Sequence, residues 1–270
     1  MPKVNVNGVC INYSQINCER KDACEDVVMI HGLAASLAFW GFHHAPVFSK
    51  RYRVTIFDLR GHGRSEMTEG GYSPCNLTVD LQLLLDKLQI RRAHFIAHSF
   101  GGIIALKLAR LDPQRICSIT IADTHITAVR NMQHDMKWSF GDKIQPILHR
   151  NNILMDVNDP YFGYRLLTEI ARKQIKNQLF TPDFQELVSS FVGRFGGRSA
   201  VQWLKLMDTT RAETEIMRDD DLSLQELKMF KFPILAVYGE HSQSMLTGKN
   251  LLDVWPHADF RCVRNGGHFF

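Results

Sequence analysis

Short apolar runs alternate with segments of helical periodicity through residues 1–125, and this alternation constrains the fold more than any other feature of the chain. Residues 3–13 alternate apolar and polar side chains around Asn7-Gly8, which predicts a hairpin at a sheet edge. Apolar residues recur at helical spacing after Pro74 and after Gly101. Four short runs bounded by turn residues read as buried strands: residues 27–30, 53–57, 93–97 and 116–121. Strands alternating with helices in this way are typical of an α/β protein with a parallel sheet.

The second half of the chain has a different pattern. After residue 125 strand signals stop, and amphipathic helices follow, among them residues 161–180 and helices that start near Thr181, Ser199 and Ser223. Strand character returns at residues 233–238 and 260–263. The sequence therefore predicts an α/β core formed by residues 1–125 and 231–270, with residues 126–230 inserted as an all-helical lid.

Composition and charge exclude several classes of protein. The 270 residues are 45% hydrophobic and 22% charged, as expected for a globular domain. Thirty-two basic residues stand against 28 acidic ones, a net charge of +4, so the basic footprint of a nucleic-acid-binding protein is missing. No signal peptide and no apolar run near 18 residues is visible, and we expect a cytoplasmic protein with no membrane association. The six cysteines are scattered, and we expect reduced, mostly structural thiols and no metal.

The sharpest local signal is a strand that runs into a helix through a tight turn at Ser99. The turn reads Ala97-His98-Ser99-Phe100-Gly101-Gly102, a small-x-Ser-x-Gly pattern with alanine at the first small position. Such a turn exposes a nucleophilic serine at the top of a sheet, and small residues are needed because the backbones crowd there. Ser99 is the predicted nucleophile.

Two further motifs lie at strand ends. His31-Gly32-Leu33 follows the second buried strand, and we expect the backbone N–H of Leu33 to join that of Phe100 as an oxyanion hole. Residues 58–65, Asp-Leu-Arg-Gly-His-Gly-Arg-Ser, are predicted to form a structural turn that braces the loops. We expect His62 and His98 to be supporting residues and not bases.

The base is predicted to be His268. It follows Gly266-Gly267 just beyond the last strand, where a loop can carry it over the carboxyl edge of the sheet to Ser99.

These four motifs, taken in order, make the chain resemble an α/β-hydrolase. The resemblance implies an eight-stranded, mostly parallel sheet, a Ser-acid-His triad, a helical lid after the sixth strand, and no metal or organic cofactor. Serine at position 99 argues against the epoxide-hydrolase and haloalkane-dehalogenase branches, which have aspartate there. Relatives continue into a final helix, whereas two residues follow His268, so we expect either further residues in the native protein or a missing helix.

The triad acid departs from the family pattern. Most relatives carry it after the seventh strand, in a Gly-x-x-Asp segment, and here Ser242 occupies that position. Two carboxylates are candidates: Asp123, at the end of the sixth strand, and Glu240, two residues before Ser242. Asp123 is the favoured prediction, and Glu240 is the alternative.

An acid after the sixth strand resembles the thioesterases that release acyl chains from carrier proteins in polyketide and nonribosomal peptide biosynthesis. The lid is rich in phenylalanine and methionine, and basic residues outnumber acidic ones by seven to three between residues 165 and 205. This charge suits a phosphopantetheine phosphate or an acidic carrier protein. The predicted substrate-binding residues are Phe184, Phe191, Trp203, Lys205 and Met207. Helical apolar stripes also commonly serve packing alone.

The predicted function is hydrolysis of an acyl thioester through an acyl-enzyme. Three alternatives remain open: a small-molecule carboxylesterase or lactonase, a C–C bond hydrolase, and a non-catalytic receptor on the same fold. The oligomeric state and the acyl chain are not predicted.

Overall fold

The computed structural model describes residues 2–19, 24–132, 138–178, 180–186, 197–218 and 220–270. One eight-stranded sheet organises these residues, with strand order β1-β2-β4-β3-β5-β6-β7-β8. The strands are β1 (Lys3–Val6), β2 (Val9–Ile16), β3 (Asp26–Ile30), β4 (Arg53–Phe57), β5 (Ala93–His98), β6 (Ile116–Ala122), β7 (Ile234–Gly239) and β8 (Asp259–Val263). β1 and β2 pair antiparallel, as does β2 with β4, and all other pairs are parallel. The predicted α/β-hydrolase fold with a mostly parallel sheet is confirmed.

The hairpin is where Asn7-Gly8 predicts it, because both residues take the positive φ that a tight two-residue turn requires, +51° and +74°. Two helices cover one face of the sheet: α3 (Pro74–Lys87), capped by the Ser73 side chain, and α4 (Phe100–Leu111). Their buried apolar sides join the main hydrophobic core. Two short helices, α1 (Ala38–Gly41) and α2 (His44–Phe48), carry buried residues into a second, smaller core cluster.

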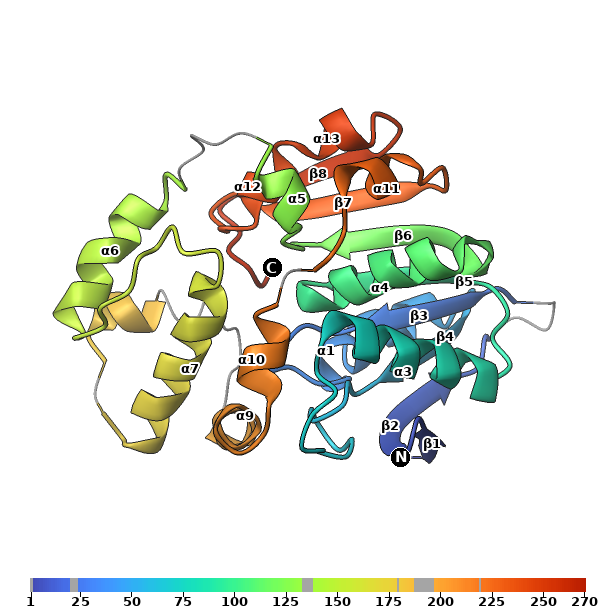
Figure 1. Ribbon diagram of the computed structural model, residues 1–270, viewed down its shortest axis with the longest axis horizontal. Coiled ribbons are helices and arrows are strands. Elements are labelled where there is room, and N and C mark those ends of the chain that lie inside the picture. The colour runs from blue at the N-terminus through green and yellow to red at the C-terminus, as the bar shows by residue number, and fades with distance from the viewer. Residues whose placement is uncertain (1, 20–23, 133–137, 179, 187–196, 219) are drawn as a thin grey trace.

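Helices occupy the described residues between β6 and β7. They are α5 (Thr127–Arg130), α6 (Gly141–Arg150), α7 (Phe162–Ile175), α9 (Gly197–Thr209), α10 (Ala212–Ile216) and α11 (Leu224–Lys228), with residues 182–186 also helical. The predicted capping box at Ser223 is present in α11. In Figure 1, α6, α7 and α9 lie together beside the part of the molecule that contains the sheet. A helical insertion is thus present, while the lid limits of 126–230 stay a prediction.

Short helices also connect the later strands. A 3-10 helix η1 (Pro113–Arg115) precedes β6, and α12 (Met245–Gly248) and α13 (Leu251–Val254) separate β7 from β8. No helix among the described residues is long and apolar enough to span a membrane.

The prediction that all the cysteines are reduced is wrong for one pair. Cys18 and Cys24 form a disulfide between the end of β2 and the start of β3, with their Cα atoms 6.4 Å apart. The spacing of these two cysteines in the sequence matches no common motif, so the pattern alone does not indicate the pair. Cys10, Cys75, Cys117 and Cys262 are free thiols. Since structural disulfides persist in oxidising compartments, the cysteines do not support a cytoplasmic location, which stays a prediction.

Candidate active site

Ser99 stands between β5 and α4 in a backbone conformation that few L-residues adopt. Its φ is +54° and its ψ is −124°, a strain of about 1–3 kcal/mol that the surrounding packing must hold. The glycines that follow it are sterically required. A Cβ on Gly101 would lie 2.7 Å from the His31 carbonyl oxygen, and one on Gly102 would lie 2.0 Å from Thr124 Oγ1. The turn therefore holds the serine out at the end of its strand.

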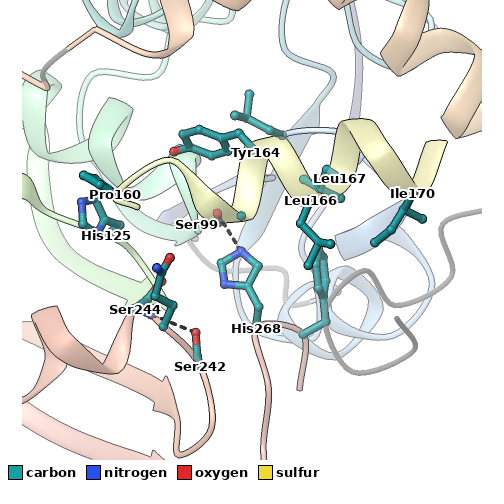
Figure 2. Close-up of a pocket in the computed structure, with 14 residues that line it drawn as sticks. Ser99, His125, Pro160, Tyr164, Leu166, Leu167, Ile170, Ser242, Ser244 and His268 are labelled. Atoms are coloured by element: carbon teal, nitrogen blue, oxygen red, sulfur yellow. Dashed lines mark hydrogen bonds between the residues drawn. The ribbon is translucent and has the colours of Figure 1, made fainter. Parts of the chain in front are cut away.

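His268 faces Ser99, as Figure 2 shows. Its Nε2 lies 2.9 Å from Ser99 Oγ, and its Nδ1 lies 2.5 Å from Asp123 Oδ2. A carboxylate accepts only, so Nδ1 carries the proton and Nε2 is left to accept from the serine hydroxyl. The three predicted residues come together in one continuous chain of hydrogen bonds from β5, β6 and the loop after β8.

Asp123 is fully buried, and its two oxygens have several donors. Oδ1 accepts the Gly239 N–H at 3.0 Å, and Oδ2 accepts the Ser242 hydroxyl in addition to His268. A buried carboxylate is tolerated when it is paired and hydrogen-bonded in this way. Ser242, at the position where most relatives carry the acid, thus contacts the acid supplied by β6. The sequence pattern carries no signal for this contact.

Glu240 has a different place. Its Oε2 accepts the N–H of Asn265 at 2.9 Å, so it holds the start of the loop that carries His268. Of the two candidate acids, Asp123 is the one whose carboxylate the structure brings to His268.

A buried histidine, His98, is hydrogen-bonded to the same loop. His98 donates its Nε2–H to the carbonyl oxygen of His268 at 2.9 Å. Burial, followed by the nearby His268, lowers the pKa of His98 to about 3. His98 is therefore neutral near pH 7 and adds no charge that would oppose protonation of His268. It is a positioning residue, as predicted.

The two residues predicted for the oxyanion hole flank the serine. Phe100 is the first residue of α4, and Leu33 lines the same cavity as Ser99 and His268. Gly32 explains the close approach of Leu33, because a Cβ on Gly32 would lie 2.9 Å from the Ser99 Cβ. The oxyanion role of their N–H groups stays a prediction.

Residues 58–65 brace the rim of the site, by which we mean the strand ends and loops around Ser99. Asp58 is buried and accepts from the Asn12 side chain and from the N–H groups of Leu37 and Arg64, at 2.6, 2.7 and 2.9 Å. Arg60 forms a two-point ion pair with Asp80.

The histidines of this bracing region are also buried. His31 accepts the Leu59 N–H on Nε2 and donates its Nδ1–H to the Gly32 carbonyl oxygen. Burial lowers the pKa of His31, and it lowers that of His62 to about 4. His62 donates its Nδ1–H to the Arg60 carbonyl oxygen, in keeping with the predicted structural turn.

Ser99 and His268 line a cavity (Figure 2). Its wall includes Leu166, Leu167 and Ile170 from α7, and its polar side includes His125, Gln243 and Ser244. The free space of about 60 Å³ holds a few water molecules or a short acyl group. Tyr164 also lines it, and burial raises the pKa of that phenol. The amphipathic pattern of α7 was visible in the sequence, but not which of its residues would face Ser99.

Of the predicted substrate-binding residues, the four that the structure describes do not line this cavity. Phe184 packs on Phe180, with ring centroids 4.8 Å apart, and Trp203 donates its indole N–H to Thr168 Oγ1 at 3.1 Å. Met207 is buried in the core, and Lys205 is exposed. Phe191 lies outside the described residues. The reason is helix packing: these apolar side chains are buried between α7, α9 and neighbouring segments.

Known proteins resemble this chain over both the sequence and the fold. Residues 27–270 match the family model described as alpha/beta hydrolase fold. A putative carbamate hydrolase RutD of Stutzerimonas stutzeri is 39% identical over 94 residues, which cover 34% of this chain and 35% of that protein. The dihydrolipoyllysine-residue acetyltransferase component of the acetoin cleaving system of Pseudomonas putida is 37% identical over 95 residues, which cover 35% of this chain and 25% of that protein. Each alignment thus spans about a third or less of the relative's length.

Among solved structures, the enol-lactonase from Burkholderia xenovorans LB400 superposes with a TM-score of 0.63 at 24% identity, covering 97% of this chain and 91% of that one. At that identity the likeness establishes the fold alone.

Proposed function

The chain belongs to the alpha/beta hydrolase family, and from that premise we propose that it is a serine hydrolase that cleaves a small carboxylic ester or lactone through an acyl-enzyme. The observation that carries the proposal is the hydrogen-bond chain from Ser99 through His268 to buried Asp123. A serine is a weak nucleophile at neutral pH, and an adjacent base oriented by a third group activates it.

In the proposed reaction, His268 Nε2 removes the Ser99 proton as Oγ attacks the substrate carbonyl. Asp123 stabilises the imidazolium through Nδ1–H. The N–H groups of Leu33 and Phe100 donate to the oxyanion, each donor contributing about 3 kcal/mol in the transition state. The imidazolium returns its proton to the leaving alkoxide, which departs as the alcohol. A water molecule, deprotonated by His268, then releases the acid and restores the serine.

The cavity supports a small, uncharged acyl group. Half of its described lining consists of aliphatic and aromatic side chains, and this lining contains no Lys, Arg, Asp or Glu. Apolar walls with a few placed polar groups favour binding of a neutral ester or lactone. Lactonases and esterases on the same fold are compatible with this choice.

Thioester cleavage is the second candidate, and the position of the acid favours it. Asp123 follows β6, the arrangement that resembles thioesterases acting on carrier-bound acyl chains. The basic residues between 165 and 205 would then receive a phosphopantetheine phosphate or an acidic carrier protein. The four described residues predicted to bind the acyl substrate do not line the Ser99 cavity, and we therefore rank this candidate second.

The test uses one short acyl group attached either to an alcohol or to a pantetheine-like thiol. We expect turnover of the oxygen ester with higher kcat/KM, and a covalent adduct with a fluorophosphonate at Ser99. Ser99→Ala should abolish both signals. A higher kcat/KM on the thioester would replace the first candidate with the second. Absence of turnover and of labelling in the wild type would point to a receptor and overturn the proposal.

A further inference from the structure

A second cluster of reactive side chains lies at the other end of β5, away from Ser99. Glu25 immediately precedes β3, His94 is the second residue of β5, and Cys117 is the second residue of β6. One carboxylate oxygen, one imidazole nitrogen and the thiol sulfur all lie within 4.8 Å of one another. The proposed hydrolysis uses none of these groups.

A β-bulge accounts for the position of Cys117. In the parallel β5–β6 ladder, Ala93 pairs with Ile116, but His94 pairs with Ser118, so Cys117 is the extra residue between the two pairs. Regular strands send successive side chains to opposite faces, and a bulge at one residue changes where that side chain points. The register shift thus explains how Cys117 reaches His94 although it directly precedes Ser118.

His94 is held with one nitrogen toward the cluster. Its Nδ1 lies 2.7 Å from Ser118 Oγ, and the Tyr52 ring packs edge-on against it with centroids 5.6 Å apart. Its Nε2 is buried and, among the described residues, has no hydrogen-bond partner; the nearest carboxylate oxygen, from Glu25, is 3.6 Å away. A hydrogen bond at one imidazole nitrogen that orients the other is the usual arrangement around a metal-binding histidine.

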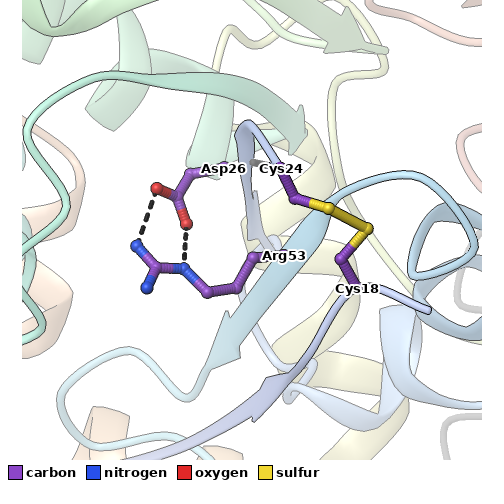
Figure 3. The surroundings of a disulfide bond; sticks show 4 residues. All are labelled: Cys18, Cys24, Asp26 and Arg53. Atoms are coloured by element: carbon purple, nitrogen blue, oxygen red, sulfur yellow. Dashed lines mark hydrogen bonds and ion pairs between the residues drawn. A yellow bond between two sulfur atoms is a disulfide. The ribbon is translucent and has the colours of Figure 1, made fainter. Parts of the chain in front are cut away.

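Glu25 is anchored on both sides along the chain. Cys24, before it, is tied to Cys18, and Asp26, after it, forms a two-point ion pair with Arg53 at 2.6 and 2.9 Å (Figure 3). The Glu25 carbonyl oxygen also accepts the N–H of Arg53. The backbone at Glu25 is therefore fixed although its side chain is mostly exposed.

We propose that Glu25, His94 and Cys117 bind a thiophilic divalent cation, with Zn²⁺ the best match. Sulfur, nitrogen and carboxylate oxygen are the three ligand types of zinc sites, whereas Mg²⁺ and Ca²⁺ prefer oxygen alone. Bond lengths of about 2.0–2.3 Å place two ligands about 3.5 Å apart across a tetrahedral ion, close to the Glu25–His94 separation. A thiolate and a carboxylate also neutralise the ion in a half-buried site.

Two arginines lie around this site. The Arg92 guanidinium donates to the Ile116 carbonyl oxygen and lies near Cys117, while Arg53 is paired with Asp26. Burial, the largest effect, raises the pKa of the Cys117 thiol, and Arg92 offsets part of that rise, so the ion must displace the thiol proton when it binds. Three protein ligands leave a fourth position for water. The ion would connect the starts of β3, β5 and β6.

Titration with Co²⁺, followed by absorbance in the absence of added thiols, tests the proposal. We expect a sulfur-to-cobalt charge-transfer band that saturates at one ion per chain and that Zn²⁺ displaces. Cys117→Ser should remove the band, and Glu25→Gln, at an exposed side chain, should weaken binding about tenfold or more. Zn²⁺ should raise the Tm of the wild type and leave that of Cys117→Ser unchanged.

Cys262→Ser is the matched control, because Cys262 is another free thiol and is exposed on β8. It should retain both the band and the Tm shift. Protein blocked at Ser99 by a fluorophosphonate should also retain the band and the Tm shift, which would show that the ion does not bind at His268. Failure of the wild type to give the band, or persistence of the band in Cys117→Ser, would overturn the proposal whatever the outcome for hydrolysis.

Discussion

The rim that carries Ser99 and the helical segment between β6 and β7 follow different physical rules. On the rim, residues at strand ends meet because the backbones crowd: Gly32, Gly101 and Gly102 each lie where a Cβ would collide. In the helical segment, side chains interdigitate, and the rotation of each helix decides which of them face the cavity. Ser99 and His268, both predicted from short motifs, lie within hydrogen-bond distance, whereas the four described helical residues predicted to bind the substrate do not line the cavity beside them.

This difference has a physical origin. A strand-to-helix turn admits few backbone conformations, so a short motif determines where its side chain points. An amphipathic helix shows which face is buried but not what that face is buried against. Mutations in the rim should therefore change the rate of reaction, and mutations in the helical segment should change stability or selectivity.

The largest expected effect is at the acid. Asp123→Asn should lower kcat by about 10⁴-fold, because the amide no longer holds the Nδ1–H tautomer of His268. Glu240→Gln should stay within a few-fold of the wild type, since the Glu240 carboxylate accepts the Asn265 N–H in the loop and, among the described residues, makes no hydrogen bond to His268. Steady-state kinetics on both variants, with circular dichroism to check folding, measure this contrast. The reverse result would make Glu240 the acid and remove the main support for the thioester candidate.

The next effect is steric. Gly32→Ala should lower kcat by about 10²-fold with little change in KM, because its Cβ would lie 2.9 Å from the Ser99 Cβ and 3.0 Å from His98 Nδ1. The shift would move the Leu33 N–H away from the oxyanion. Kinetics and thermal unfolding measure the two consequences separately. Activity near that of the wild type would show that the rim is less crowded than its geometry implies.

A pH effect on stability should also arise at the rim. In the folded state the pKa of His62 is about 4 and that of His98 about 3, below the ordinary value of 6.5. Between pH 6.5 and these lowered values, the unfolded chain therefore binds more protons at these two histidines than the folded protein. Their contribution is therefore complete above pH 6.5 and is lost as pH falls, by about 1.4 kcal/mol per pH unit for each group.

Urea unfolding at pH 7, 6 and 5 measures this slope. His62→Gln should make it shallower by about 1 kcal/mol per pH unit. His149→Gln is the control, because His149 is an exposed residue of the helical segment, and this change should leave the slope as it is. Equal slopes in the wild type, His62→Gln and His149→Gln would contradict the lowered pKa of His62 in the folded protein.

The smallest expected effect is on selectivity. Gly163 in α7 lines the cavity, and a Cβ there would meet nothing within 4 Å. Gly163→Ala should reduce kcat/KM for longer acyl groups by about fivefold relative to short ones, while stabilising the helix by about 0.5–1 kcal/mol. A series of esters of increasing acyl length and a thermal melt measure both.

Trp203→Phe, in the same helical segment, should change stability and leave selectivity unchanged. It removes the indole N–H that Thr168 accepts and leaves space in the core, so the free energy of unfolding should fall by about 2 kcal/mol. The relative kcat/KM values for the ester series should not change. A change in acyl-chain-length preference for this variant would show that Trp203 contacts the substrate.

The amino-acid sequence alone predicts the strands of the core, the two helices after Pro74 and Gly101, the nucleophile motif, the histidine that meets it and two candidate acids. These follow from local periodicity and from turns that few residues can form. The tertiary structure alone decided that Asp123 reaches His268, that Ser242 donates to that acid, and which face of α7 lines the cavity.

The same holds for the Cys18–Cys24 disulfide and for the meeting of Glu25, His94 and Cys117. Glu25, His94 and Cys117 come from three separate segments, and the disulfide joins the segment after β2 to the one before β3. Strand pairing, register and helix packing set such contacts, and a linear pattern does not contain them.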